Sequence, residues 1–383
     1  MVYEPVCHGL EHVPFNCGIL SAALELANGC VTFVAEESHL ALVREASSHE
    51  VRQAVDWQQV VIAPRRLAGF RARLPYESRL LSQVWEIAGK RSATALVGTG
   101  VTEPGLLALK LKLWSSPSTR PVGVVFHGVL SCFLYSRKRR FYLRAATPRR
   151  LRYLLLGETI RNEVVKLVPQ IAPNAFVLPH PLATGLCSGP LDLDPARLVF
   201  GFLGLGSEEK GFPLFLRMAR ELAGDPPSLA QFEAIGPYPD AYRSEVHGLL
   251  DSAGGRFRAS RDTNVAIPME GYHARLRELA YVVLPYSIEA YRFTCSGAAL
   301  DAVTAAKPMI ALRTAQIEDL FARMGDIGYL CSDYAEMLRT VRKIAADPPR
   351  ARYHRQRDNL VRGRELFGTG AVARQLAAAL AAN

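Results

Sequence analysis

The residues with the clearest chemical potential form a glycine-rich turn in the second half of the chain. The apolar run Val199–Leu203 is followed by Gly204, Gly206 and then Lys210, which stands where an amphipathic helix begins. Such a turn lets backbone N–H groups approach phosphate oxygens, and an exposed lysine beside it can neutralise them. The spacing matches neither the Rossmann fingerprint, because position 209 is not glycine, nor a P-loop. We therefore predict an anion site here, with a plain strand-to-helix turn as the alternative.

A second group of polar residues follows the apolar run that ends at Pro285. Thr294 and Ser296 are good helix N-cap types, and Gly297 comes directly before an expected helix. A helix N-terminus concentrates N–H donors where an anion can bind, and Arg292 can add a bidentate phosphate contact. The alternative is an ordinary capped helix beside a solvated arginine.

Taken together, the stretches 202–212 and 284–310 resemble the donor-binding half of family-4-type GT-B glycosyltransferases, also called glycosyltransferase group 1. The resemblance implies that Lys210 contacts the donor diphosphate and that Asp301 contacts the donor ribose. The family carries a further acid eight residues earlier, where this chain has Phe293. This difference implies a subgroup that anchors the donor through other residues. The donor-binding set that we infer comprises Gly204, Gly206, Lys210, Tyr291, Arg292, Thr294, Ser296, Gly297 and Asp301.

The resemblance extends more faintly to residues 122–181. His127 follows the apolar run Val122–Phe126, and open α/β sheets place ligand groups at the carboxyl ends of their strands. We therefore treat His127 as a candidate catalytic residue together with Lys210 and Arg292, and a structural histidine is the alternative. The loop before the first helix matches a loop of the family's cleft, and its acceptor-side candidates are Glu11, His12 and Asn16.

The sequence predicts no metal ion and no cofactor beyond the nucleotide-sugar substrate. Asp192 and Asp194 spell the D-x-D pattern of GT-A enzymes, but they lie in a proline-flanked linker rather than at a strand end. The seven cysteines include no C-x-x-C pair, and the chain has no H-x-x-x-H or H-E-x-x-H motif. We interpret the cysteines as reduced and mostly buried.

A basic and aromatic segment spans residues 137–152, in a chain with a formal net charge of +10. It contains eight basic residues and no acid. Basic side chains attract an anionic bilayer surface, and aromatic rings suit the interface. The segment therefore predicts a peripheral membrane contact, with a solvated basic face as the alternative. A nucleic-acid partner is not expected, because no recognition motif accompanies the charge.

The elements that must position these residues follow from alternating apolar and amphipathic runs, which are typical of parallel α/β layers. We predict strands at Cys30–Ala35, Val60–Ala63, Thr94–Val97, Val122–Phe126, Leu154–Leu156, Phe176–Leu178, Val199–Leu203, Phe232–Ile235, Val282–Pro285 and Met309–Leu312. We predict helices at Asn16–Asn28, Glu77–Lys90, Glu103–Trp114, Glu158–Leu167, Lys210–Ala223, Ala241–Ser252, Tyr272–Ala280, Ala298–Ala306, Tyr334–Ala346, Pro349–Leu366 and Ala371–Ala382. Asn16 is the expected N-cap of the first helix, and Gly29 its expected stop.

This pattern predicts an α/β protein with two Rossmann-like, doubly wound parallel sheets, which the resemblance places across a cleft as in the GT-B fold. A length of 383 residues suits two domains. We predict an acceptor-side domain over 1–185, a turn-rich linker over 186–196 and a donor-binding domain over 197–365. A final helix over 366–383 is expected to pack back toward the N-terminal domain.

The location that we expect is the cytoplasm, with peripheral attachment to the inner leaflet of the membrane. Apolar runs stay well below the ~18 residues of a membrane span. The first residues have neither the basic nor the apolar region of a secretion signal.

These features predict a glycosyltransferase, of the hexosyltransferase type, that moves a sugar from a nucleotide-diphosphate sugar to a saccharide or lipid-linked saccharide acceptor. Catalysis would consist mainly of stabilising the departing diphosphate. Two alternatives stay open. One is a sugar-nucleotide epimerase of the same fold, which needs no acceptor, and the other is a degenerate GT-B module that only binds.

Overall fold

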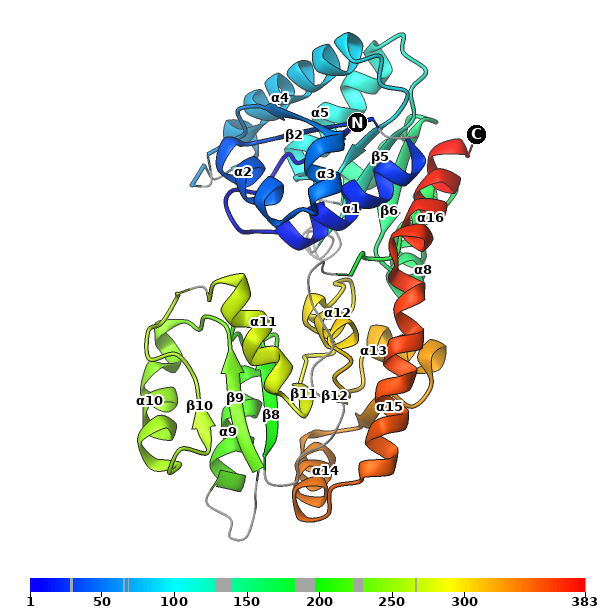
Figure 1. The fold of residues 1–383 in the computed structure, drawn as a ribbon. Coiled ribbons are helices and arrows are strands. Elements are labelled where there is room, and N and C mark those ends of the chain that lie inside the picture. The colour runs from blue at the N-terminus through cyan, green and yellow to red at the C-terminus, as the bar shows by residue number, and fades with distance from the viewer. Residues whose placement is uncertain are drawn as a thin grey trace. The chain divides into compact units, whose positions relative to one another are not determined.

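A computed structural model describes the chain except for residues 28–29, 65, 68, 128–139, 183–196, 224–229, 266 and 383. The chain divides into two compact units (Figure 1). Each unit has its own hydrophobic core. Unit 1 comprises Met1–Thr184, Phe293–Cys295 and Leu366–Asn383, and unit 2 comprises Gly185–Arg292 and Ser296–Glu365. The predicted linker 186–196, with Asp192 and Asp194, lies outside the described residues.

Unit 1 is built on a seven-stranded parallel sheet in the order β3-β2-β1-β4-β5-β6-β7. The strands are β1 (Val2–Tyr3), β2 (Val31–Ala35), β3 (Val55–Gln59), β4 (Leu96–Gly98), β5 (Val122–Phe126), β6 (Leu151–Leu155) and β7 (Ala175–Val177). The strand order reverses between β1 and β4. Open α/β sheets bind ligands at such a switch point, outside the carboxyl ends of the strands.

Helices cover both faces of this sheet, which explains why β2, β5 and β6 are buried along their whole length. The helices are α1 (Val13–Leu26), α2 (Glu37–Ala46), α3 (His49–Ala54), α4 (Phe70–Lys90), α5 (Glu103–Ser115), α7 (Arg140–Arg144), α8 (Glu158–Leu167), the 3-10 helix η1 (Pro169–Asn174) and α16 (Thr369–Ala381). The C-terminal α16 packs against α1, and its Val372 and Leu376 share a core cluster with Ile19 and Leu20.

Unit 2 is built on a six-stranded parallel sheet in the order β10-β9-β8-β11-β12-β13. The strands are β8 (Leu198–Leu203), β9 (Ala230–Ile235), β10 (Phe257–Arg258), β11 (Tyr281–Leu284), β12 (Met309–Leu312) and β13 (Gly328–Cys331). The helices are α9 (Phe212–Ala223), η2 (Asp240–Tyr242), α10 (Arg243–Ser252), α11 (Met269–Glu278), α12 (Gly297–Thr304), α13 (Ala315–Met324), α14 (Tyr334–Ala346), α15 (Arg350–Gly363) and η3 (Arg364–Phe367). Two parallel, doubly wound sheets confirm the predicted fold class.

The predicted strand Val60–Ala63 is wrong, because the strand in this region is β3 at Val55–Gln59. The apolar side chains of Val60 and Ile62 are buried beyond the end of the strand. By contrast, β3 is an edge strand with half-buried polar residues, and edge positions tolerate polar side chains. Apolar character alone therefore marked the wrong residues.

The first helix begins at Val13 rather than at Asn16, and His12 is its N-cap in the left-handed conformation. Pro14 favours this earlier start, since proline suits the first turn of a helix. Asn16 is fully buried inside the helix, so its side chain does not act as the cap. The expected stop at Gly29 lies outside the described residues.

Candidate active site

The glycine-rich turn after β8 is fixed by hydrogen bonds to the loop that follows β9. The N–H of Gly204 donates to the carbonyl of Ile235 at 2.8 Å, and the N–H of Gly206 donates to that of Pro237 at 2.8 Å. These two N–H groups are therefore already occupied, contrary to the expectation that they face a phosphate. A Cβ atom on Gly206 would meet the ring of Phe212 at 2.8 Å, so packing explains this glycine.

Gly204 has a different role, because it leaves room for the ammonium group of Lys210. Its φ is +84°, and a Cβ atom there would lie 2.8 Å from Lys210 Nζ. Lys210 precedes α9, and its N–H donates to Ser207 Oγ at 3.3 Å. The side chain is half-buried rather than exposed as the sequence suggested. Burial lowers the pKa of Lys210, and the nearby carboxylate of Asp301 opposes this shift.

Asp301 lies in α12 and is held by a tyrosine from another helix. Tyr272, in the first turn of α11, donates its hydroxyl to Asp301 Oδ2 at 2.7 Å. Burial raises the pKa of Asp301 to about 6, although both the Tyr272 hydrogen bond and the charge of Lys210 act in the opposite direction. The structure thus brings together Gly204, Lys210 and Asp301. Tyr272 was missed, since a single tyrosine in a helix carries no signal in the sequence.

Ser296 is the N-cap of α12, as predicted, and its polar atoms form hydrogen bonds that fix the loop between β11 and α12. Its Oγ accepts from the N–H of Ala299 at 3.1 Å and lies 2.7 Å from the hydroxyl of Tyr286. Its own N–H donates to Gln316 Oε1 at 3.0 Å. The side chain is buried, so it builds the helix terminus rather than reaching a ligand itself.

Gly297, the first residue of α12, is exposed, and a Cβ atom added there would have open space around it. Tyr291 is buried and stacks on Tyr286, with ring centroids 3.9 Å apart and planes inclined by 4°. Arg292 is half-buried between β11 and α12, and its N–H donates to the carbonyl of Glu289 at 3.3 Å. Thr294 is half-buried and belongs with Phe293 to the segment that groups with unit 1.

In unit 1, three histidines gather where the sequence singled out His127 and His12. The rings of His12 and His127 have centroids 3.8 Å apart, and His127 Nε2 lies 3.2 Å from His180 Nε2. Phe15 contacts the rings of both His127 and His180 edge-on, with centroid distances of 4.8 and 4.9 Å. His12 Nδ1 lies 3.2 Å from Cys7 Sγ.

All three imidazoles are held in the neutral form by their surroundings. Burial lowers the pKa of His12, lowers that of His180 to about 4 and lowers that of His127 well below its ordinary value. The charge of Glu4 partly opposes the shift at His12. At neutral pH each ring therefore has one N–H donor and one bare nitrogen acceptor.

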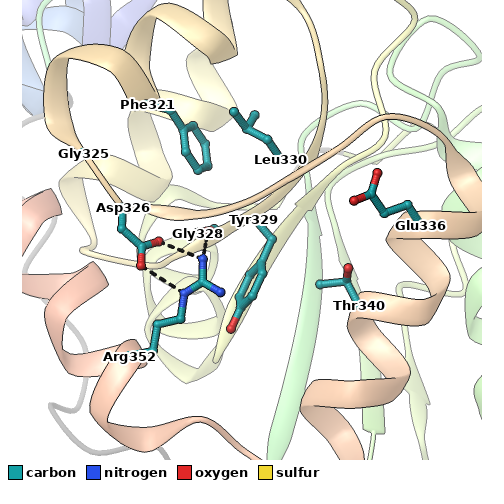
Figure 2. A pocket seen from close by; sticks show the side chains of 9 residues that line it. All are labelled: Phe321, Gly325, Asp326, Gly328, Tyr329, Leu330, Glu336, Thr340 and Arg352. Atoms are coloured by element: carbon teal, nitrogen blue, oxygen red, sulfur yellow. Dashed lines mark hydrogen bonds and ion pairs between the residues drawn. The ribbon is translucent and has the colours of Figure 1, made fainter.

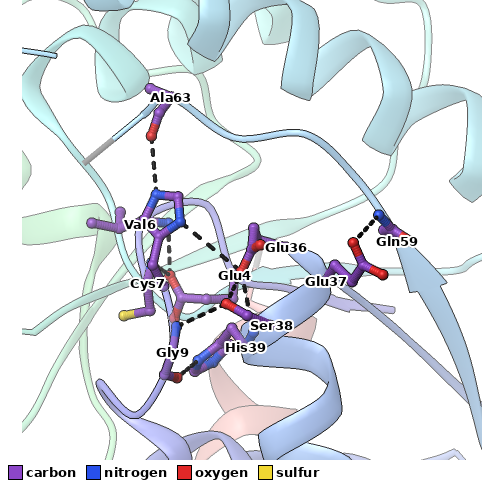
Figure 3. Close-up of polar contacts among 11 residues, drawn as sticks. Glu4, Val6, Cys7, Gly9, Glu36, Glu37, Ser38, His39, Gln59 and Ala63 are labelled. Atoms are coloured by element: carbon purple, nitrogen blue, oxygen red, sulfur yellow. Dashed lines mark hydrogen bonds and ion pairs between the residues drawn. The ribbon is translucent and has the colours of Figure 1, made fainter. Parts of the chain in front are cut away.

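The loop that carries His12 is organised around the fully buried carboxylate of Glu4, which sequence reasoning did not single out. Its Oε1 accepts from the N–H groups of Val6 and Cys7 at 2.8 and 3.1 Å (Figure 3). Its Oε2 accepts from Thr99 Oγ1 at 2.8 Å and from Asn16 Nδ2 at 3.2 Å. This carboxylate thereby joins the loop after β1 to the residue that follows β4 and to α1.

Two further histidines secure the same loop from its other side. His39 Nδ1 lies 2.7 Å from the carbonyl oxygen of Gly9 (Figure 3). Its Nε2 lies 2.8 Å from Asn16 Nδ2. His8 Nε2 lies 3.1 Å from the carbonyl oxygen of Ala63. Asn16 is therefore a buried structural link rather than a surface contact, whereas Glu11 is exposed.

Glu4, Cys7 and His12 also form a group whose ligand atoms lie within 4.8 Å of one another, a spacing that suits a metal ion. Each oxygen of Glu4 already accepts two hydrogen bonds. A cation at this position would have to displace hydrogen-bond donors from a fully buried carboxylate, and leaving those donors without a partner costs free energy. The arrangement is better explained as the support of the loop.

A cavity in unit 2 lies beside β13, and none of the predicted site residues lines it (Figure 2). Its charged groups already have partners within the protein. Arg352 Nε lies 2.9 Å from Asp326 Oδ2, and its guanidinium lies 4.2 Å from the ring centroid of Tyr329. Glu336 accepts from the N–H of Ser332 at 2.7 Å. We therefore do not place the active site here.

Residues 137–139 of the basic segment lie outside the described chain, and the structure describes residues 140–152 of it. Arg150 Nη2 donates to the carbonyl of Ser116 at 2.7 Å, and Arg152 Nε donates to that of Ala379 at 3.0 Å. These two arginines hold the fold together. The exposed remainder comprises Phe141 and Arg144 on α7 together with Arg149, and Arg140 is half-buried. Among the described helices, none combines the length and apolar character needed to cross a bilayer.

No protein-family model and no curated protein sequence matches the chain. Several solved structures match along nearly their whole length. The complex of HepE from Anabaena with UDP and glucose is 13% identical, covers 100% of this chain and 99% of its own, and gives a TM-score of 0.70. Sucrose-phosphate synthase from Thermosynechococcus elongatus is 14% identical, with coverage of 98% and 97% and a TM-score of 0.69. WaaG, a glycosyltransferase involved in lipopolysaccharide biosynthesis, is 12% identical, with full coverage of both chains and a TM-score of 0.61. The chain therefore has the GT-B fold, as the resemblance implied.

Proposed function

We propose that the protein is a glycosyltransferase that takes a hexose from a nucleoside-diphosphate sugar. The observation that supports this most directly is the group of Lys210, Asp301 and Tyr272, which lies where strands of a GT-B donor-type sheet end. A lysine above a glycine turn suits a diphosphate, and an oriented carboxylate suits the hydroxyls of a ribose. HepE has been solved with UDP-glucose, which makes that sugar nucleotide the first donor to test.

In this proposal, unit 2 holds the donor. Lys210, Arg292 and the N-terminus of α12 face the diphosphate and offset the charge that grows on it as the glycosidic bond breaks. Gly297 leaves the space in which the phosphates lie, and Asp301 binds the ribose. Tyr291, Thr294 and Ser296 shape the loop between β11 and α12. The reaction so described needs no metal ion or other cofactor.

Unit 1 supplies the acceptor side, and its candidate contacts are His127, His12 and Glu11. The acceptor that we propose is a saccharide or a lipid-linked saccharide. The exposed basic and aromatic residues of α7 and Arg149 would then hold the protein against an anionic inner leaflet, in keeping with a cytoplasmic enzyme that is peripheral to the membrane.

A panel of nucleoside diphosphates and their sugars tests the proposal by thermal shift. A ligand at 100 times its dissociation constant stabilises the folded protein by about 2.7 kcal/mol. The best donor is then incubated with and without saccharide acceptors, and the products are separated. Transfer supports the proposal, whereas an altered sugar formed without acceptor indicates an epimerase. Binding without any turnover indicates a module that only binds.

A further inference from the structure

The cavity beside β13 is a concave surface of unit 2 that the proposed transfer chemistry does not use (Figure 2). Its volume is about 500 Å³, within the range of roughly 300–1,000 Å³ that small-molecule sites occupy. Gly325 and Asp326 on its wall precede β13, so they lie at the amino edge of the parallel sheet. Lys210 and α12, by contrast, follow the carboxyl ends of β8 and β11. The cavity is therefore separate from the candidate donor site.

The charged side chains around this cavity leave it with one negative charge. Arg352 donates from Nε to Asp326 Oδ2 at 2.9 Å and from Nη2 to Oδ1 at 3.2 Å, and Gln356 Nε2 donates to Oδ1 at 2.8 Å. Burial would raise the pKa of Asp326, but these hydrogen bonds lower it below its ordinary value. The N–H of Ser332 lowers the pKa of Glu336. Two carboxylates against one guanidinium repel an anion such as phosphate, and the bidentate pairing of Asp326 weakens its attraction for a cation.

The same lining offers hydrogen-bond partners that suit hydroxyl groups. A carboxylate has about four acceptor sites, and described residues occupy three of those on Asp326. Glu336 is a second carboxylate acceptor, and Thr340 on α14 has a hydroxyl that can donate or accept. A neutral ligand with several hydroxyls can therefore be held here without carrying a charge of its own.

The edge strand β13 contributes polar and apolar surface to the same cavity. The carbonyl of Cys331 accepts from the N–H of Arg313 at 3.1 Å, on the side of β12. Because backbone groups alternate along a strand, Leu330 directs its N–H and C=O to the outer edge of the sheet. The rings of Phe321 and Tyr329 line the cavity with the Leu330 side chain, and all three residues are half-buried. Apolar surface beside carboxylates suits a pyranose ring, which has C–H groups on its faces and hydroxyls on its rim.

We propose that the cavity beside β13 binds a neutral saccharide and serves as a second sugar site, apart from the place of transfer. Such a site keeps a saccharide acceptor or product on the protein and raises its effective concentration at the transfer site. The saccharide class follows from the charge, the hydroxyl partners and the apolar surface of the lining. The tethering of an acceptor, by contrast, rests on the proposed function.

Saturation-transfer NMR with maltose and cellobiose as probes tests the site. We expect the wild type to transfer saturation to at least one of these sugars with or without saturating UDP, and equally at high salt, since the ligand is neutral. Glu336→Gln and Thr340→Val should each weaken binding about threefold to tenfold, the scale of one hydrogen bond. Thr340→Trp, which fills the cavity, should abolish it. Glu365→Gln, at an exposed position in η3, is the control, and every variant should bind UDP as the wild type does.

Several results overturn the proposal. Sugar binding that UDP abolishes belongs to the donor site, and unchanged binding in both Thr340→Val and Thr340→Trp places the sugar elsewhere. Binding of spermidine or inorganic phosphate in place of the sugars means a charged ligand, and no transfer to either sugar at millimolar concentration means no sugar site. A folded wild type that fails to bind UDP overturns the proposed function instead, and the sugar titrations still decide the cavity.

Kinetics with two acceptor lengths test the tethering. We expect Thr340→Trp to raise KM for a long saccharide acceptor severalfold without changing kcat, because the transfer site is intact. With a monosaccharide acceptor, which is too short to reach both sites, KM should stay unchanged. An equal KM for the long acceptor in wild type and Thr340→Trp overturns the tethering, and a change in kcat for both acceptors indicates a structural defect.

Discussion

Lys210 is the residue on which the proposed chemistry depends most directly. Its ammonium lies over Gly204 and close to Asp301. We expect Lys210→Ala to lower kcat by about 10²- to 10³-fold, the effect of losing one preorganised electrostatic contact in the transition state. The fold should persist, because the side chain is only half-buried. Initial rates and circular dichroism check both points. Lys343→Ala, on the exposed side of α14, is the control, and a wild-type rate in folded Lys210→Ala removes Lys210 from the mechanism.

A substitution at Gly297 tests whether the N-terminus of α12 binds the diphosphate. A side chain there has open space in the free protein, so Gly297→Val should change the free energy of unfolding by about 1 kcal/mol or less. If phosphates occupy that space, the same change abolishes donor binding. Calorimetric titration with the nucleoside diphosphate measures this. Gly248→Val, at an equally open position in α10, should bind normally, and retained affinity in Gly297→Val contradicts the model.

The raised pKa of Asp301 makes the free energy of unfolding of the protein depend on pH. Its pKa is about 6 in the folded protein against 3.8 for the free side chain, so folding takes up protons between these values. The free energy of unfolding contributed by Asp301 therefore falls as pH rises from about 4 to 6. We expect Asp301→Asn to stabilise the free protein above pH 6 by about 1–3 kcal/mol, a net value because the pKa of about 6 already includes the attraction to Lys210. Donor binding should weaken at the same time.

Chemical denaturation across pH 4–8 checks this prediction about Asp301. The wild type should show the downward slope between pH 4 and 6, and Asp301→Asn should show less of it. Asp358→Asn, at an exposed position in α15, provides the matched control and should leave the slope unchanged. A steeper slope in Asp301→Asn would mean that the buried carboxylate stabilises the fold.

At the scale of elements, the short helix α7 and the residues after it test the membrane contact. Lys110 anchors the C-terminal end of this helix, because its Nζ donates hydrogen bonds to the carbonyls of Tyr142 and Ala145 at 2.7 Å each. Phe141 remains 64% exposed, a large apolar ring beside exposed arginines. This combination suits the interface of an anionic bilayer, where each basic residue contributes about 1 kcal/mol.

We expect the triple change of Arg140, Arg144 and Arg149 to glutamine to weaken binding to vesicles that contain anionic lipids, measured by sedimentation. The wild-type binding should fade as salt rises, since salt screens exposed charges. The control removes the same charge from α14 of unit 2, through Arg339, Arg342 and Lys343. Equal binding by the wild type and the triple variant supports a merely solvated basic face.

At the scale of the whole molecule, the proposal places the nucleotide on unit 2. Because the two units have separate cores, its effect on hydrogen exchange can be measured in each unit by itself. We expect a nucleoside diphosphate to slow hydrogen exchange in the peptides 204–212 and 285–301 of unit 2. Peptides around β5 in unit 1 should change only when a sugar is also present. Exchange measured by mass spectrometry with nucleotide, nucleotide sugar or neither tests this. If the nucleotide slows exchange only in unit 1, the assignment of the donor to unit 2 is wrong.

Local patterns in the sequence determined much of the architecture. The bounds of β5, β12, α8 and α14 were predicted to the residue, because each is a strongly apolar strand or a clearly amphipathic helix. The polar edge strand β3 was misplaced, and β10, β13, α2, α3 and α13 were not predicted. The edge strands β10 and β13 and the short polar helix α3 bury little surface, so they leave only a weak apolar pattern, whereas α13 buries Ile317, Leu320 and Met324 and its amphipathic pattern was missed.

The candidate site divides in the same way. Lys210 and Ser296 could be named from the sequence, because a glycine turn and a helix cap are local features with local signatures, whereas Asp301 was named only through the resemblance to the family. Tyr272, Glu4 and His180 could not, since their partners lie 29, 95 and 53 positions away. The protonation of these groups also depends on burial, which only tertiary packing creates. Local patterns therefore predicted most of the strands and the helix cap at Ser296, and the tertiary structure alone decided the strand order, which side chains hold the candidate site and in which protonation state.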